Sequence, residues 1–503
     1  MSSKKPMSRR EMKRRKRRNA LILKSVLLCV LVVVLIVAIW VLTGGPDKLK
    51  KKGSGSTSES VSTSSGEQGS SSGSSSSSSS STPSGGVVAG GKEDLMNQAS
   101  MLATQYDYDG AIELLNSIEG ADQDADIITM VADFETKRSN LVATPPEKVT
   151  HIFFHSLVVD PERGFSLTDS ESWNNATAGF CQWMTTVDEF NAIIQQMYDR
   201  GYVLVDLDDM VDKTTDENGT VHVTAKNIML PQGKIPFVMS LDDLSYYHSY
   251  DGRGTATRMI IGEDGKPTCE YVQADGTTVT GSYDCVPLLD DFLEVHPDFS
   301  YKGAKGTIAL TGYNGILGYR TDYCYRDRVD LGADQEAWLN AHPEFNWDEE
   351  CAKAKEVAEC LKADGWKFAS HTWGHIRIGD ADMEWLQTDT QKWLDYVAPL
   401  IGGSDRIIFA HGQDLAAWNE DYASTEKFQY LKSKGFDIYC NVDSTQYFVQ
   451  IGDLFLRMGR RNLDGYRLWE AVYGGNDKVS DLIDAASVID PKRPTDASLY
   501  NLG

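Results

Sequence analysis

Two histidines spaced four residues apart are the clearest sign of chemistry in this sequence. His371 and His375 belong to the segment Ser-His-Thr-Trp-Gly-His, which directly follows the apolar run 366–369. Imidazoles at this spacing, within one turn of chain, can point at one position. Imidazole nitrogen is a good ligand for zinc and neighbouring divalent metals. The pair therefore predicts part of a metal site that needs at least one further ligand.

An acidic pair can complete that ligand set. Asp242 and Asp243 come directly after the strand-like run 235–241. Asp243 and the two histidines would give three protein ligands and leave a position for water, the pattern of a catalytic zinc site. Asp242, which points elsewhere, would then be the general base for that water. An isolated Asp-Asp pair is more often a loop or cap, so the hypothesis requires both stretches to lie at strand ends of one sheet.

Alternating strand-like and helix-like segments from residue 149 onward meet this requirement. The strand-like runs are 151–155, 202–207, 235–241, 306–311, 366–371, 406–410 and 436–441. The helix-like runs are 186–200, 285–296, 348–364, 383–400 and 425–434. Such βα repeats predict a parallel barrel or an open parallel sheet, in which functional residues collect at the carboxyl ends of the strands. We expect the last strand within 447–458 and an inserted β-hairpin within 251–284.

The first 90 residues have the composition of a membrane anchor and a linker. Residues 1–24 are very basic, and 25–43 form an uncharged apolar run of 19 residues, long enough to cross a bilayer as one helix. A cleaved signal peptide is the alternative. Ser and Gly dominate 44–90, which predicts a disordered linker. The positive-inside rule predicts a single-pass protein of the cell membrane, with a cytoplasmic N-terminus and an extracellular catalytic domain.

Residues 91–145 predict three helices whose spacing resembles one tetratricopeptide-like unit. One such unit cannot bury its apolar face alone. We expect a helical spacer that docks on the next domain, with peptide or protein binding as the alternative. The catalytic domain is expected over 148–475, and a C-terminal tail over 476–503.

Charge and cysteine usage exclude several classes of function. The first 52 residues carry 15 Lys and Arg against two acidic residues, a net charge of +13. Because the whole chain has a net charge of -24, the remaining residues carry -37. An acidic body argues against nucleic acid as a partner and favours a neutral or cationic polymer. None of the eight cysteines forms a C-x-x-C motif, which argues against zinc-finger and redox functions. Cys269 and Cys285 flank the insert, but unpaired buried cysteines are the favoured interpretation.

The two motifs resemble those of polysaccharide deacetylases with a NodB homology domain, carbohydrate esterase family 4. The family motif T/S-F-D-D is similar to the segment 240–243, and H-[ST]-x-x-H matches 371–375. The resemblance covers roughly 148–460. It implies a distorted (β/α)7 barrel, an α/β fold, that removes acetyl groups from N-acetylated cell-envelope polysaccharide of the peptidoglycan or poly-N-acetylglucosamine type. It also implies that Asp242 is the base and that Asp243, His371 and His375 bind a divalent metal, with zinc favoured over cobalt or nickel.

The later family motifs assign the remaining residues. The segment Phe409-Ala-His411-Gly412 stands in place of the third motif, and the backbone N–H near His411 is expected to stabilise an oxyanion. Trp373, Phe409 and Gly412 are expected to contact substrate. The family's general-acid histidine has no counterpart in 454–461, so either His155 or His411 takes that role. The alternatives are a catalytically weak or inactive glycan-binding module, or a scaffold beside a peptide-binding helical adaptor.

Overall fold

The computed structural model describes residues 91–418 and 420–501. The predicted cytoplasmic tail 1–24, membrane helix 25–43 and linker 44–90 lie outside these residues. Within the described part of the chain, no helix is both long and apolar enough to cross a membrane.

Seven parallel strands form a closed ring. They pair in the order β7-β11-β12-β13-β14-β16-β2, and β2 returns to β7. Their bounds are β2 Thr150–Phe154, β7 Ile235–Asp242, β11 Thr307–Leu310, β12 Lys367–Ser370, β13 Arg406–Ile408, β14 Ile438–Val442 and β16 Phe455–Asn462. The predicted seven-stranded α/β barrel is confirmed. β3 (Tyr202–Leu204) pairs with β7 outside the ring.

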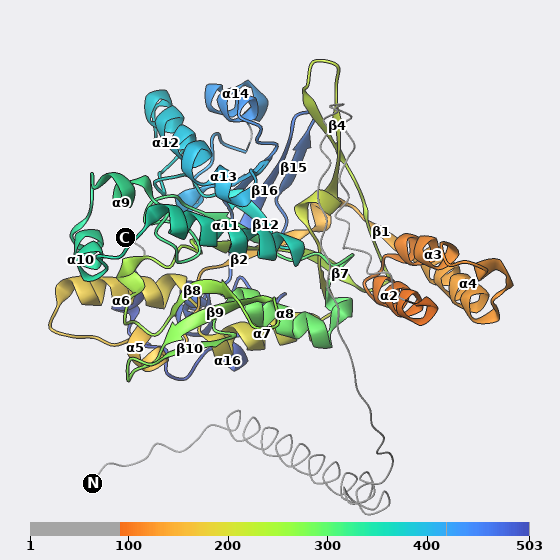
Figure 1. Ribbon diagram of the computed structural model, residues 1–503, viewed down its shortest axis with the longest axis horizontal. Helices are drawn as coiled ribbons and strands as arrows, with labels where there is room; N and C mark the ends of the chain where they lie inside the picture. The colour runs from red at the N-terminus through yellow and green to blue at the C-terminus, as the bar shows by residue number, and fades with distance from the viewer. Residues whose placement is uncertain (1–90, 419, 502–503) are drawn as a thin grey trace, which may run out of the picture. The chain divides into compact units, whose positions relative to one another are not determined.

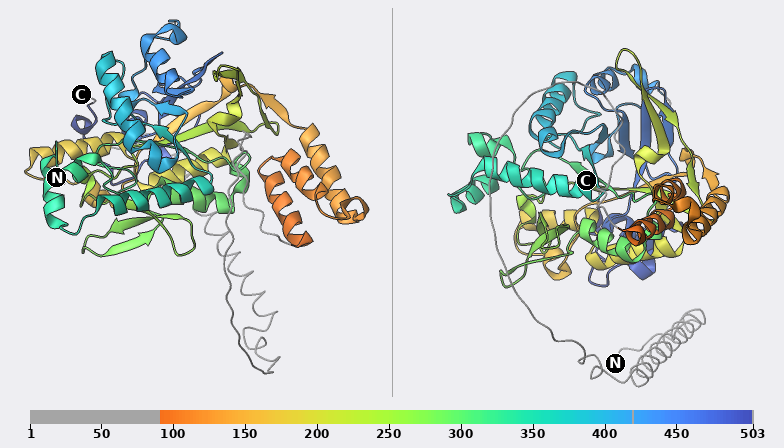
Figure 2. Two further views of the ribbon diagram at one scale, coloured as in Figure 1. Left: turned by 45° about the horizontal axis from the view of Figure 1, so that its top comes forward. Right: turned by 45° about the vertical axis from the view of Figure 1, so that its right-hand side comes forward.

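Helices surround this ring, as the views in Figures 1 and 2 show. The longer ones are α6 Glu171–Trp183, α7 Val187–Asp199, α8 Cys285–Val295, α11 Trp347–Ala363, α12 Met383–Tyr396 and α14 Glu426–Ser433. The capping box of α7 illustrates why they begin where they do. The Thr186 hydroxyl accepts a hydrogen bond from the Glu189 amide at 3.2 Å, and the Glu189 carboxylate accepts one from the Thr186 amide at 2.8 Å.

Two expectations about strands need correction. The segment 447–458 holds no single strand, because it turns back on itself: β15 (Val449–Gly452) pairs antiparallel with β16, and β16 is the barrel strand. The insert within 251–284 is a three-stranded antiparallel sheet instead of one hairpin. Its strands are β8 Ala256–Ile261, β9 Pro267–Val272 and β10 Thr278–Gly281. Gly265 and Gly276, with φ of 80° and 86°, lie in its two turns, as Asp-Gly pairs favour.

Three helices precede the barrel: α2 (Lys92–Thr104), α3 (Tyr108–Asn116) and α4 (Ala125–Ser139). They share a small apolar core of their own. The turn between α2 and α3 contacts the barrel domain, because the Tyr106 hydroxyl donates to the Asp298 carbonyl at 2.8 Å. The Lys302 amide donates to the Gln105 carbonyl at the same distance.

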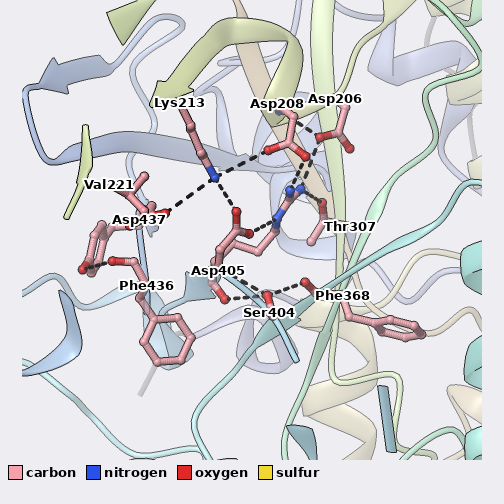
Figure 3. A network of polar contacts seen from close by, with 12 residues as sticks. Asp206, Asp208, Lys213, Val221, Thr307, Phe368, Ser404, Asp405, Phe436 and Asp437 are labelled. Carbon is pink, nitrogen blue, oxygen red and sulfur yellow. Dashed lines mark hydrogen bonds and ion pairs between the residues drawn. The ribbon is translucent and has the colours of Figure 1, made fainter. Parts of the chain in front are cut away.

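A buried polar network closes the barrel at the amino ends of its strands (Figure 3). Arg406, the first residue of β13, is 3% exposed and pairs with Asp208 at 2.7 Å, Asp405 at 3.2 Å and Asp206 at 3.3 Å. The Lys213 ammonium lies among the carboxylates of Asp208, Asp405 and Asp437. This end of the barrel is therefore filled by charge pairs, which leaves the carboxyl ends of the strands for chemistry.

Candidate metal centre and catalytic cavity

The two motifs meet at the carboxyl end of the barrel. β7 ends at Asp242 and β12 ends at Ser370, so Asp243 and His371 each begin the loop that follows its strand. His375 Nε2 lies 3.5 Å from one Asp243 carboxylate oxygen, and His371 Nε2 lies 4.0 Å from the other. One potential ligand atom from each of the three residues falls within 4.8 Å of the other two.

These residues fit a divalent metal ion. Their donors are two imidazole nitrogens and a carboxylate oxygen, the set that catalytic zinc sites use. At metal–ligand distances of about 2.0–2.2 Å, ligands of one ion lie roughly 3–4 Å apart, and the two Asp243–histidine separations of 4.0 and 3.5 Å agree with this spacing.

Left-handed backbone conformation aims the side chains of this site. Asp243, Thr372, His375 and His411 have φ of 58°, 62°, 51° and 56°. Residues other than glycine rarely adopt these angles, which cost about 1–3 kcal/mol each and cluster at functional sites. The surrounding contacts must therefore hold the loops in place.

Asp389 on α12 supplies contacts that hold the histidine loop. One carboxylate oxygen accepts from the Trp373 amide at 2.8 Å and the other accepts from the Gly374 amide at 2.7 Å. The Thr372 hydroxyl also accepts from the Ile376 amide at 2.9 Å. The turn between the two histidines is thus fixed by a side chain from the next helix.

His371 is oriented as a metal ligand by its second ring nitrogen. Nδ1 lies 2.8 Å from the Ile408 carbonyl, which accepts only if Nδ1 carries the proton. Nε2 is then the unprotonated nitrogen that faces Asp243. Burial lowers the pKa of His371 to about 4, so the imidazole is neutral at neutral pH, as a metal ligand must be.

Tyr247 orients the Asp243 carboxylate. Its hydroxyl donates to Asp243 Oδ1 at 2.7 Å and lies 2.6 Å from the Thr311 hydroxyl. Burial alone would raise the pKa of Asp243, but the two ligand histidines outweigh it and hold that pKa below its usual range. Asp243 is therefore ionised at neutral pH and available to a cation.

Asp242 is paired with a buried arginine. Arg460 on β16 is fully buried and donates to Asp242 Oδ1 at 2.6 Å, while Asp242 Oδ2 lies 3.9 Å from His371 Nε2. The guanidinium also stacks over the Phe153 ring at 4.2 Å. Burial would raise the pKa of Asp242, but Arg460 and His371 outweigh it, so the carboxyl is a carboxylate at neutral pH.

A cavity of about 550 Å³ opens over these groups. Its lining includes both ligand histidines, both aspartates and both proton-donor candidates, His155 and His411. One face of α6 forms an apolar wall with Ala176, Gly179, Phe180 and Trp183. The volume is in the range of small-molecule sites.

The three predicted substrate contacts do not all reach this cavity. Gly412 lines it, but Trp373 and Phe409 do not. The Trp373 ring packs instead beneath the Lys392 ammonium, 4.4 Å from its centre, and beside Tyr323. Phe409 is fully buried in the core, and its amide donates to the Cys440 carbonyl at 2.8 Å. Both aromatic side chains are therefore held by contacts outside the cavity lining.

His155 and His411 differ in their surroundings. His155 follows β2, and its buried Nδ1 has no hydrogen-bond partner among the described residues. Buried Asp464 lines the same cavity, and burial raises its pKa above its usual range. His411 is exposed, and its Nε2 lies 3.2 Å from the His375 carbonyl. Burial, then His375, lower the pKa of His411.

Sequence reasoning assigned no role to Arg460, Asp389 or Asp464, and it did not predict the contact of Tyr247 with Asp243. Their partners lie elsewhere in the chain or follow no motif, so no spacing indicates them. The one signal was the presence of three arginines, Arg457, Arg460 and Arg461, in the short segment 454–461. A charge on a buried barrel strand requires a partner.

Comparison with known proteins gives only weak likenesses. No protein-family model and no curated protein matches the sequence. Among solved structures, the deacetylase PplD of Streptococcus pyogenes, in complex with acetate, is similar at 12% identity and a TM-score of 0.30, over 63% of this chain and 93% of PplD. A polysaccharide deacetylase from Bacillus cereus is similar at 12% identity and a TM-score of 0.32, over 68% of this chain and 70% of its own. Likenesses of this strength carry no argument, so the function has to be inferred from the site itself.

Proposed function

We propose that this protein is a metal-dependent deacetylase acting on N-acetylated cell-envelope polysaccharide of the peptidoglycan or poly-N-acetylglucosamine type. The observation that carries the proposal is the ligand set Asp243, His371 and His375 beside an ionised, arginine-paired Asp242 at one cavity. Zinc, cobalt or nickel suits these ligands, and such an ion polarises an acyl oxygen and acidifies water when bound.

The protein's own residues supply the proton transfers. Asp242 takes a proton from the water that attacks the acetyl carbonyl carbon, and Arg460 keeps that carboxylate ionised and oriented. The backbone N–H near His411 donates to the carbonyl oxygen as it gains negative charge. When the C–N bond breaks, a histidine gives a proton to the leaving nitrogen, so the products are acetate and a free amine.

His155 is the better candidate for this proton donor. It lines the cavity, and its buried Nδ1 has no hydrogen-bond partner among the described residues, so the ring is free to reach a leaving group there. His411 is exposed and bonds the His375 carbonyl, which suits it to support the ligand loop. His155→Gln is therefore expected to reduce kcat more than His411→Gln does.

Acetate release tests the proposal. The protein is stripped with chelator, reloaded with zinc, cobalt or nickel, and incubated with acetylated glycan fragments. We expect release only from loaded protein, and a fall of about a hundredfold or more in Asp242→Asn. Asp453→Asn, at an exposed position, is the matched control. Loaded protein that releases no acetate from any acetylated glycan would overturn the proposal.

A glycan-binding module is the second candidate, favoured by the missing histidine in 454–461. It predicts that glycan affinity survives in Asp242→Asn while the wild type shows no turnover. Calorimetry with both proteins separates the two functions.

We also propose that residues 25–43 anchor the protein in the cell membrane with the barrel outside, on the basis of their uncharged length. Residues 91–145 are proposed as a spacer that can contact a peptide or protein. Protease accessibility of the barrel in intact cells tests the orientation.

A further inference from the structure

Arg467 is a buried arginine that faces the catalytic cavity without an acidic partner. It lies on α15 (Gly465–Trp469), is 8% exposed, and belongs to the cavity lining. Its Nε and one terminal nitrogen donate to the Asn462 side-chain oxygen at 3.3 and 3.0 Å, and the same terminal nitrogen donates to the Ser444 hydroxyl at 3.2 Å. Both partners are neutral. The acidic side chain nearby is Asp464, which accepts from the Arg467 backbone amide at 2.8 Å, but no carboxylate of the described residues forms an ion pair with the guanidinium itself.

Other buried arginines near this site have acidic partners. Arg460 pairs with Asp242, Arg457 with Asp414 and Arg461 with Asp481, at 2.6 to 2.8 Å. A buried cation normally requires such a partner, because leaving it unpaired costs several kcal/mol by order of magnitude. Arg467 has no such ion pair, and it lines the cavity, where a ligand can reach it.

Two further buried arginines lack a carboxylate but are explained by their contacts. Arg253 stacks on the Trp173 ring at 3.7 Å and donates to the Trp173 carbonyl. Arg320 donates to the backbone carbonyls of Tyr246 and Asn314. Neither residue lines the cavity, so they offer no site for a ligand.

The guanidinium of Arg467 keeps donors available. Its second terminal nitrogen makes no hydrogen bond to any residue within 91–418 or 420–501. Arg377 lines the same cavity, is exposed, and forms no ion pair with the described residues. A guanidinium binds carboxylate or phosphate oxygens through paired, charge-assisted hydrogen bonds.

We propose that the acetylated sugar bound in this cavity carries an anionic substituent, a carboxylate or a phosphate, which Arg467 binds and Arg377 assists at the rim. This inference rests on the proposed deacetylase function and narrows its substrate. The acidic body of the protein repels polyanions at long range. Arg467 and Arg377 place positive charge locally in this acidic protein. A sugar with one carboxylate or phosphate therefore fits the cavity better than a densely charged polymer does.

Matched sugars test the inference by binding alone. The probes are methyl N-acetylglucosaminide, its 3-O-lactyl ether, the amide of that ether, and its 6-phosphate. Calorimetry uses the full, zinc-loaded Asp242→Asn protein, so that no turnover intervenes. We expect the lactyl ether or the phosphate to bind at least about tenfold more tightly than its neutral counterpart. Which of the two wins identifies the source of the anionic group.

Substitutions then show which arginine is responsible for the preference for charged over neutral probes. Arg467→Gln should bring the charged and neutral probes within about twofold of each other and leave neutral affinity unchanged. Arg377→Gln, an exposed change that carries little folding risk, should reduce the preference by about threefold. Arg326→Gln, at a surface pair with Asp327, is the matched control and should change nothing.

Three results would overturn the inference: equal affinity of the starting protein for charged and neutral probes, equal loss of both probes in Arg467→Gln, or an unchanged preference in that variant. If Arg467→Gln does not melt cooperatively and is therefore not folded, two measurements still test the inference. They are the preference of the zinc-loaded Asp242→Asn protein for charged probes and the reduction of that preference in Arg377→Gln. Turnover without charge preference would refute this inference alone. Charge preference without acetate release by the wild type would refute the deacetylase function and leave the anion site standing.

Discussion

At the scale of single residues, the Arg460–Asp242 pair sets the state of the proposed base. The pair is buried, and its 2.6 Å hydrogen bond joins β16 to the end of β7 across 218 positions of the chain. Because Arg460 lowers the pKa of Asp242 against the effect of burial, the carboxylate stays ionised in an environment that would otherwise protonate it.

Replacing Arg460 by Gln should raise the pKa of Asp242. Asp242 would then hold its proton to higher pH, so the acidic limb of the kcat/KM profile moves upward, by at least one pH unit. Arg460→Lys retains the positive charge and should move that limb less. Identical pH profiles of the wild type and Arg460→Gln would argue against Asp242 as the base. Melting curves check that both variants fold.

Tyr247→Phe should weaken metal binding without unfolding the protein. The change removes the hydroxyl that holds Asp243 Oδ1 and contacts Thr311. Loss of such an outer contact typically reduces metal affinity about 10–100-fold. Competition with a chelator measures it. Tyr250→Phe, a cavity residue that makes no bond to Asp243, is the control; an equal loss there would point to a general effect of the cavity wall.

At the scale of elements, the loop between β12 and α12 depends on a single carboxylate. Asp389→Ala leaves the Trp373 and Gly374 amides without their acceptor, at a cost of about 2–4 kcal/mol in the free energy of unfolding. Metal affinity should fall as well, because His375 needs its left-handed backbone. Denaturant titration and chelator competition measure the two effects. Asp395→Ala, an exposed position on the same helix, should change neither.

The N-terminus of α8 predicts a dependence of stability on pH. Asp284 caps this helix, is fully buried, and accepts from the Tyr246 hydroxyl at 2.8 Å. Burial raises the pKa of Asp284 to about 6 from its ordinary 3.8. The folded carboxyl keeps its proton where the unfolded one ionises, so this stabilisation is lost as the pH rises from about 4 to about 6.

Asp284→Asn removes this titration. Relative to the variant, the wild type should lose about 3 kcal/mol of unfolding free energy across that pH window. Urea denaturation of both proteins at several pH values between 4 and 6.5 gives the difference directly. A constant difference across the window would show that Asp284 titrates normally.

The sequence was informative where function follows order along the chain. Asp242, Asp243, His371 and His375 lie at or just after the ends of two strands, and parallel strands bring those ends together, so the motifs and their place at strand ends predicted this grouping. The neighbours that tune it could not be found this way. Arg460 and Asp389 act through contacts with distant segments. The hairpin of β15 and β16 was missed because the segment 447–458 was interpreted as one strand, although Gly452 and Asp453 stand at the turn between the two. The place of Trp373 outside the cavity lining could not be predicted either, because sequence does not reveal which way a loop side chain points.

At the scale of the whole molecule, the contacts that stabilise the barrel and the residues proposed for catalysis lie at opposite ends of its strands. Charge pairs around Arg406 fill the amino end (Figure 3). The candidate metal site lies at the carboxyl end. Arg406→Met leaves Asp206 buried without its partner and should cost about 3–5 kcal/mol in the free energy of unfolding. Acetate release per folded molecule should not change. Arg326→Met, at a surface ion pair, should leave the melting temperature unaltered. Loss of metal affinity in Arg406→Met would show that the two ends are coupled.

The position of β16 in the ring has a consequence for how the protein is made. It is the last barrel strand along the chain, yet it lies between β14 and β2, the first barrel strand. Until residues 455–462 have been synthesised, β14 and β2 expose open edges to other chains. The same late strand brings Arg460 to Asp242. Until this strand is made, a nascent chain is prone to aggregation, and its Asp242 lacks the arginine partner. Ribosome-arrested chains that end before residue 455 should therefore bind chaperones that recognise exposed β-strand edges.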